Sequence, residues 1–183
     1  MASWSAFAGC APVVPAHEGA RAVPVEPFAS VSVTVWPGQT EALREALGFD
    51  LPAPGRWTHA GALVAVWLGP GHFLLQREGS APLPPELAPV VGDTAALIDL
   101  TDARATLRIA GPACRDILAA LLPIDLHPRA FAPGHAATTV AAHLTVQVLQ
   151  RDATTYDLTV SRSFAGSLWR ALELAGAGRL RLG

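Results

Sequence analysis

The chain has 183 residues, of which 51% are hydrophobic and only 15% are charged, and its formal net charge is −2. A near-neutral chain without a basic face excludes the usual electrostatic recognition of nucleic acid. No run approaches the ~20 apolar residues that cross a bilayer, and the N-terminus lacks the pattern of a signal peptide, so we expect a cytoplasmic protein without membrane contact.

Residues 1–29 predict an extended, proline-rich arm. They contain four prolines, which oppose a regular helix or a central strand. The same segment carries apolar side chains such as Trp4, Phe7 and Phe28. We therefore expect the arm to lie across this domain or across a partner. The two cysteines, Cys10 and Cys114, have no metal-like spacing and are expected to be free thiols.

From Val31 onward the sequence becomes periodic. The predicted order is a strand, a helix that ends at Gly48, a hairpin with a tight turn at Gly69-Pro70-Gly71, and a short helix. The residues 48–61 are expected to form a loop. The ranges of the four elements are 31–35, 40–47, 62–76 and 85–91.

A strand at 95–100 then joins this part to a second set of elements. The second set has a strand at 105–110, a helix at 113–122 and a strand at 138–149 that is broken near Ala141. A strand at 155–161 and a helix at 163–175 complete it, with Ser163 as the N-cap and Gly176 as the stop.

The two sets repeat one order of elements: strand, helix, hairpin, helix. Chance similarity between two ordinary α/β units is the alternative. The mostly antiparallel strands with helices between them predict an α+β fold. We expect a single duplicated domain over residues 30–183 after the arm at 1–29, with halves at about 30–94 and 95–176.

No strong catalytic signature is present, and we expect no catalytic, cofactor-binding or metal-binding residues in the chain itself. Gly69-Pro70-Gly71 stands in a hairpin, which is the wrong context for a phosphate loop. His127, His135 and His143 could meet at a metal, but no Cys or acidic ligand shares their spacing, which favours ordinary loop histidines. Asp99 and Asp102 are expected to hydrogen-bond turn backbone.

A partner interface is the remaining kind of site. The charge content lies below the roughly 25% usual for globular domains, which favours a large covered surface, although abundant alanine is an alternative reason. Trp67 with Phe73 forms either part of the core or a rigid aromatic contact surface. The candidate interface residues are Trp67, Gly69, Pro70, Phe73, Arg162 and Phe164.

Several stretches together resemble one family. They are Val25-Glu26-Pro27-Phe28, Trp67-Leu68-Gly69-Pro70, Asp99-Leu100-Thr101, Leu107-Arg108-Ile109-Ala110-Gly111-Pro112-Ala113, Leu122-Pro123-Ile124-Asp125-Leu126, Phe131-Ala132-Pro133-Gly134 and Ser161-Arg162-Ser163-Phe164. Their order and spacing resemble the gamma subunits of heterotetrameric sarcosine oxidases. The fold of that family is similar to the folate-binding domain of glycine-cleavage aminomethyltransferase, itself a duplicated α+β unit.

The resemblance implies a non-catalytic role in a complex with alpha, beta and delta subunits. Such a complex demethylates sarcosine to glycine, with hydrogen peroxide and formaldehyde or methylenetetrahydrofolate as the other products. It implies that FAD, FMN, NAD, tetrahydrofolate and zinc belong to the other subunits, and that this chain serves assembly with the alpha subunit. A free-standing folate-binding or aminomethyl-transfer protein of the same fold, and a ligand-sensing module, are the alternatives.

Overall fold

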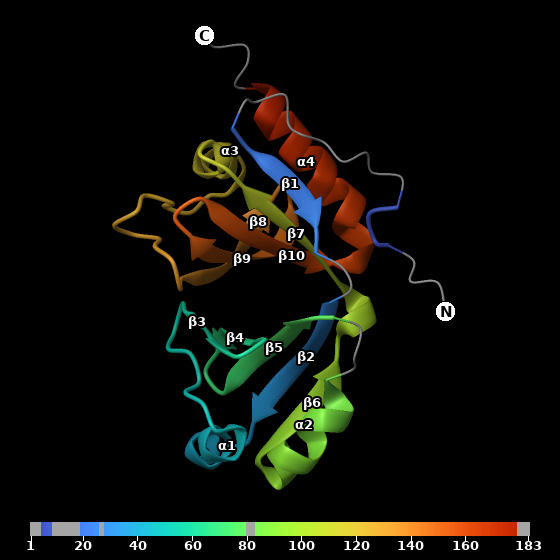
Figure 1. The fold of residues 1–183 in the computed structure, drawn as a ribbon, viewed down its shortest axis with the longest axis vertical. Helices are drawn as coiled ribbons and strands as arrows, with labels where there is room; N and C mark the ends of the chain where they lie inside the picture. The colour runs from blue at the N-terminus through green and yellow to red at the C-terminus, as the bar shows by residue number, and fades with distance from the viewer. Residues whose placement is uncertain (1–4, 9–18, 26–27, 80–82, 179–183) are drawn as a thin grey trace. The chain divides into compact units, whose positions relative to one another are not determined.

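The computed structural model describes residues 5–8, 19–25, 28–79 and 83–178. The chain divides into two compact units: unit 1 consists of Met1–Glu26 with Ala103–Gly183, and unit 2 consists of Pro27–Asp102 (Figure 1). Most of the predicted arm, including Cys10, and the tail at 179–183 lie outside the described residues.

Unit 2 is a five-stranded sheet with two helices. Every strand pairing is antiparallel, and the strands lie in the order β3-β4-β5-β2-β6. The elements are β2 (Phe28–Val35), α1 (Thr40–Leu47), β3 (Trp57–Ala60), β4 (Leu63–Gly69), β5 (His72–Glu78), α2 (Pro84–Val91) and β6 (Ala95–Asp99), with single 3₁₀ turns at Gly92–Thr94 and Thr101–Ala103.

Unit 1 is also a five-stranded antiparallel sheet with two helices. Its strands lie in the order β1-β7-β10-β9-β8. The elements are β1 (Arg21–Pro24), β7 (Arg104–Ala110), α3 (Cys114–Leu121), β8 (Ala136–Ala141), β9 (Leu144–Asp152), β10 (Thr155–Ser161), a 3₁₀ turn at Arg162–Phe164 and α4 (Ala165–Gly178).

The two sheets have the same strand order, which confirms the duplicated α+β fold. If β2 is matched to β7, and β3, β4 and β5 to β8, β9 and β10, the orders β3-β4-β5-β2-β6 and β8-β9-β10-β7-β1 coincide. Only the fifth strand differs in origin. β6 follows α2 in the chain, whereas β1 comes from the segment that precedes unit 2.

In both units the helices cover one face of the sheet, because alternate strand residues supply an apolar face. In unit 2 the face formed by Ala29, Val31 and Val33 is almost fully buried, and Leu43 of α1 packs on it. In unit 1, Ile117 and Leu118 of α3 join the core together with side chains of α4. Burying one such Leu or Ile side chain contributes about 1.5–3 kcal/mol.

Most predicted elements are confirmed, and the differences have local causes. Helix 40–47 has the predicted ends, with Gly48 in the left-handed conformation at its C-terminus. The range 138–149 is a hairpin of β8 and β9 that turns at Ala142 and His143, just after the predicted break. Strand β3 lies within the range expected to be a loop.

The predicted limits of the last helix were wrong at both ends. Ser163 lies inside the 3₁₀ turn that precedes α4, so it is not the N-cap of the helix. Gly176 does not end the helix, which continues to Gly178. A glycine costs only about 1 kcal/mol in a helix interior, so it lowers the stability of a turn without stopping it.

The division of the chain differs from the predicted ranges at two strands. β1 lies within residues 1–29 and pairs with β7 at the edge of the unit 1 sheet. β6 lies within the range expected to begin the second half, but it pairs with β2 in the unit 2 sheet. The ranges of the arm and the halves stay a prediction.

Candidate partner interface

The hairpin of β4 and β5 holds four of the six candidate residues. Trp67 and Phe73 face each other across the two strands, and the register shifts by one residue between Trp67 and Gly69, which pairs with His72. Phe73 is only 5% exposed and belongs to the unit 2 core. Trp67 is half-buried and packs against that core, so it combines core contact with an accessible ring surface.

The turn of this hairpin is fixed by backbone geometry. Pro70 is exposed, and Gly71 has φ of +65°, a conformation that costs a glycine little. Val35 N–H donates to the Gly71 carbonyl at 2.7 Å, which ties the turn to the end of β2. The backbone of this turn is therefore anchored to the neighbouring strand β2.

The other two candidate residues lie in the 3₁₀ turn between β10 and α4. Arg162 is half-buried, while Phe164 is 45% exposed. An aromatic ring that is half in contact with solvent on a fixed turn is typical of a contact anchor. The structure thus places the six residues in two groups, one in each unit.

Five further large apolar side chains are exposed and were not singled out from the sequence. They are Trp36, Val90, Ile98, Val140 and Leu174. For Val140 the signal was available in principle, because it stands between the half-buried Thr139 and the buried Ala141 along its strand, whereas Ile98 lies between the half-buried Leu97 and the exposed Asp99. Single exposed apolar residues are normal on proteins, so these become informative only together with a neighbouring feature.

Three of the polar side chains weighed from the sequence make structural hydrogen bonds. The Nδ1 atom of His135 accepts a hydrogen bond from Ala132 N–H at 2.8 Å, and that of His127 accepts one from Arg129 N–H at 3.2 Å. Asp99 accepts from Thr101 N–H at 2.9 Å, which confirms its predicted role in the turn. Within the described residues no three His, Cys, Asp or Glu side chains are grouped to hold a metal ion.

The most strongly interacting polar group in unit 1 is Asp157, which sequence reasoning missed. Its side chain is 3% exposed and accepts from Arg108 at 2.7 and 2.9 Å and from Arg151 Nε at 2.7 Å. Beside it, the hydroxyl groups of Thr106 and Thr159 lie 2.8 Å apart. These bonds cross β7, β10 and β9, so the cluster fixes the register of the sheet centre.

Cys114 is buried and is not a reactive thiol. Its Sγ donates to the Thr154 carbonyl at 3.0 Å, and desolvation by burial raises the pKa of the thiol to about 11. A thiolate nucleophile needs the opposite shift. The free thiol predicted from the sequence is therefore a core residue of unit 1.

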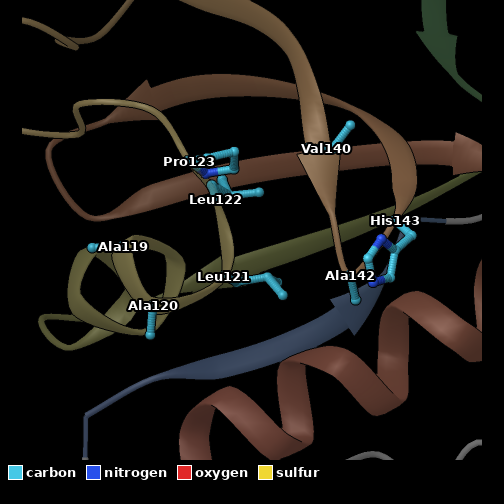
Figure 2. A pocket seen from close by; sticks show the side chains of 8 residues that line it. All are labelled: Ala119, Ala120, Leu121, Leu122, Pro123, Val140, Ala142 and His143. Atoms are coloured by element: carbon cyan, nitrogen blue, oxygen red, sulfur yellow. The ribbon is translucent and has the colours of Figure 1, made fainter.

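A pocket of about 600 Å³ opens on unit 1 (Figure 2). Its walls are residues 119–123, at the end of α3 and just beyond it, together with Val140, Ala142 and His143 at the end of β8 and the following turn. His143 is the only ionisable side chain in this lining. Such a lining suits a neutral, largely apolar group.

Comparison with known proteins identifies the family. The model of the sarcosine oxidase, gamma subunit family matches residues 33–178. The chain belongs to this family. Among curated relatives, the sarcosine oxidase subunit gamma of an Arthrobacter species is 39% identical over 121 residues, which cover 63% of this chain and 60% of the relative. The protein of the same description from Corynebacterium sp. (strain U-96) is 35% identical over 136 residues, or 70% of this chain and 66% of the relative.

Solved structures agree with that membership. A chain of the heterotetrameric sarcosine oxidase from Corynebacterium sp. U-96 superposes with a TM-score of 0.86 at 27% identity, over 96% of this chain and 95% of that chain. Aminomethyltransferase T from Bartonella henselae has a TM-score of 0.59 at 18% identity, over 85% of this chain and 46% of that chain, and so shares the fold. Among the described residues, no helix combines the length and the apolar character needed to span a bilayer.

Proposed function

We propose that this chain is a non-catalytic gamma subunit of a heterotetrameric sarcosine oxidase-type complex. The observation that carries the proposal is the superposition, with a TM-score of 0.86, on a chain of a heterotetrameric sarcosine oxidase over almost the full length of both. The aligned regions span 55–66% of the length of the curated gamma subunits. The activity of the whole complex is therefore part of the proposal.

In this proposal the chain acts by assembly. It packs against the alpha subunit, and the beta and delta subunits complete the complex. The FAD, FMN, NAD, tetrahydrofolate and zinc belong to those subunits. The complex oxidises sarcosine in the cytoplasm, releases glycine and hydrogen peroxide, and passes the methyl carbon to tetrahydrofolate or releases it as formaldehyde.

Three features of the described residues support an assembly role. Phe164 exposes aromatic surface on a 3₁₀ turn and Trp67 is half-buried near the end of β4, the Nδ1 atoms of His127 and His135 accept from loop backbone, and the Cys114 thiol is buried. We propose Trp67, Gly69, Pro70 and Phe73 as one part of the contact surface, with Phe73 acting through the position of Trp67. Arg162 and Phe164 form the other part.

Co-expression tests the proposal. The full chain, tagged, is expressed with the alpha, beta and delta subunits from the same source, and the complex is isolated through the tag. We expect all four chains to co-purify with flavin absorbance and sarcosine-dependent hydrogen peroxide production, while the chain expressed alone is colourless and inactive. Flavin bound to the lone chain, or turnover by it, contradicts the proposal. Micromolar binding of tetrahydrofolate by the lone chain, measured by calorimetry, supports a free-standing folate protein instead.

A further inference from the structure

The outer edge of β8 is unusual among the sheet edges of this molecule. β8 pairs only with β9 among the described strands, so its other side presents backbone N–H and C=O groups without a strand partner. Such an edge is a template for another extended chain, and proteins normally protect it with charges or proline. The segment Ala136–Ala141 contains neither.

The three other edge strands each carry a protective feature that β8 lacks. β1 begins with the exposed Arg21 and ends with Pro24, and β6 ends with the exposed Asp99. β3 is only four residues long and carries the exposed His59. β8 instead exposes Thr138 and Val140, both uncharged and both suited to a strand.

The pocket described above lies at this same edge. Val146, the cross-strand partner of Thr139, is fully buried in the core beneath the helices, so Thr139 and Ala141 share that face and Val140 lies on the opposite one. Yet Val140 lines one pocket together with residues 119–121 of α3, on the helix side (Figure 2). The turn residues Ala142 and His143 complete the lining, so the pocket lies at the C-terminal end of β8.

The chemistry of the β8 edge and of the pocket indicates what kind of segment binds there. Unpaired main-chain groups along β8 require an extended main chain, as in recognition by strand addition. The pocket sits at the C-terminal end of α3, where the helix dipole leaves partial negative charge that disfavours an acidic side chain. The lining contains no carboxylate or guanidinium to pair with a charged one. The occupant therefore carries an uncharged side chain where it reaches the pocket.

We propose that β8 accepts an extended, uncharged segment of a partner subunit as a sixth strand, with one apolar side chain of that segment in the pocket beside Val140. This inference rests on the proposed function, because the partner is a subunit of the same complex. It adds a further contact surface to the two proposed above, one around Trp67 in unit 2 and one around Phe164 in unit 1.

Charged edge variants test the inference in the co-expressed complex. Thr138→Lys and Val140→Lys each place a charge on the exposed edge, the device by which natural edges repel added strands. Ile98→Lys is the matched control, since Ile98 is 58% exposed on the edge strand β6 and Val140 is 49% exposed. We expect the β8 variants to retain about one tenth or less of the co-purified partner, since interface charges change affinity by at least that factor, and the control to retain it.

Amide hydrogen exchange supplies the second readout on the wild-type chain, free and assembled. We expect the amides of β8 to be protected on assembly while those of β6 are unchanged. Full co-purification of the β8 variants, or equal exchange at β8 in both states, overturns the inference and leaves the proposed function standing. Protection of β8 that grows with concentration in the free chain assigns the edge to a second copy and also overturns it. Failure of the wild-type chain to co-purify contradicts the proposed function and, with it, this inference.

Discussion

Arg108 and Asp157 face each other across β7 and β10, with Arg108 Nε 2.7 Å from Asp157 Oδ1. Arg151 approaches the same carboxylate from β9, also at 2.7 Å. A single buried carboxylate thus binds two guanidinium groups at the centre of the unit 1 sheet. Removing it takes away the carboxylate that both guanidinium groups share, which costs far more than an exposed ion pair contributes.

Asp157→Ala is expected to lower the free energy of unfolding of unit 1 by about 3 kcal/mol, since one member of a buried pair is removed. Urea unfolding followed by circular dichroism measures the change. Asp93→Ala is the control, because Asp93 is exposed, and it is expected to stay within about 0.5 kcal/mol. Equal stability of the two variants contradicts a structural role for the cluster.

Gly111→Ala is expected to be among the most damaging single substitutions in unit 1. Gly111 has φ of +128°, and an added Cβ lies 2.0 Å from the Gly19 carbonyl oxygen, so the backbone near β1 must move. We expect a loss of about 4 kcal/mol or more in thermal or urea unfolding.

Gly38→Ala separates the two causes of that loss. Gly38 also has a positive φ, +80°, but nothing lies within 4 Å of its added Cβ. Only backbone strain of about 1 kcal/mol is expected there. If Gly111→Ala lowers the free energy of unfolding no more than Gly38→Ala does, the backbone at Gly19 moves away from the added Cβ at little cost.

The turn between β8 and β9 can be stabilised. Ala142 and His143 have φ of +47° and +71°, values that favour the pair Asn-Gly in a two-residue hairpin. The double variant Ala142→Asn, His143→Gly is expected to raise stability by about 1 kcal/mol, seen as a higher Tm. Ala62→Gly, in the turn between β3 and β4 at a residue without positive φ, is expected to give no gain. An unchanged Tm in the double variant contradicts the strain assigned to this turn.

Alkaline pH is expected to destabilise unit 1 through two buried acids. Desolvation raises the pKa of Cys114 to about 11 and that of Tyr156 to about 12. Both groups keep their protons to higher pH in the folded state than in the unfolded chain, where their pKa values are about 8.5 and 10. Their contribution to folding stability is therefore fully present below these unfolded pKa values and is lost as the pH rises through the folded ones. Stability measured by urea unfolding should therefore fall from about pH 9 upward.

A matched variant assigns part of that pH slope to the thiol. Cys114→Ala is expected to flatten the decline between about pH 9 and 11, where the thiol of the unfolded chain ionises first, and to leave the decline above it. If the free energy of unfolding falls with pH at the same slope in both proteins, Cys114 does not cause the decline.

Trp67→Ala tests the interface on unit 2. Because Trp67 is half-buried against the core, we expect a loss of about 2 kcal/mol, less than for a fully buried Trp, and a folded protein. We also expect weaker co-purification with the partner subunits. Val31→Ala, within the unit 2 core on β2 and outside the proposed contact surface, is the control for stability loss alone. If the Trp67 variant assembles normally, the ring contributes to the unit 2 core and not to the interface.

The sequence predicted the parts of this fold whose signals are local. Helix 40–47 carries its own glycine stop, and the hairpin around Gly69-Pro70-Gly71 carries its own turn residues, so both were found with nearly correct limits. A break near Ala141 was expected, but the tight turn at Ala142 and His143 was not, because non-glycine residues rarely adopt positive φ. Strand β3 was missed because Trp57-Thr58-His59-Ala60 has no apolar alternation and depends on pairing with β4.

The candidate site was harder to predict, because exposure is a tertiary property. Trp67 and Phe73 read alike in the sequence, yet Phe73 is buried while Trp67 is only half-buried. The carboxylate of Asp157 meets Arg108, 49 positions away in the chain, only once β7 and β10 are in register. No local pattern gives that contact, although the charged residue in an otherwise apolar strand could have marked it.

The origin of the fifth strand in each sheet determines the order in which the molecule can be built. All the strands of unit 2 come from one uninterrupted stretch of chain, Pro27–Asp102, so its sheet can close as soon as that stretch has left the ribosome. β1 is synthesised earlier than any of them, but its partner β7 follows the whole of unit 2. Among the described strands, β1 is therefore the first to be made, and its pairing with β7 forms only after β7 has been translated.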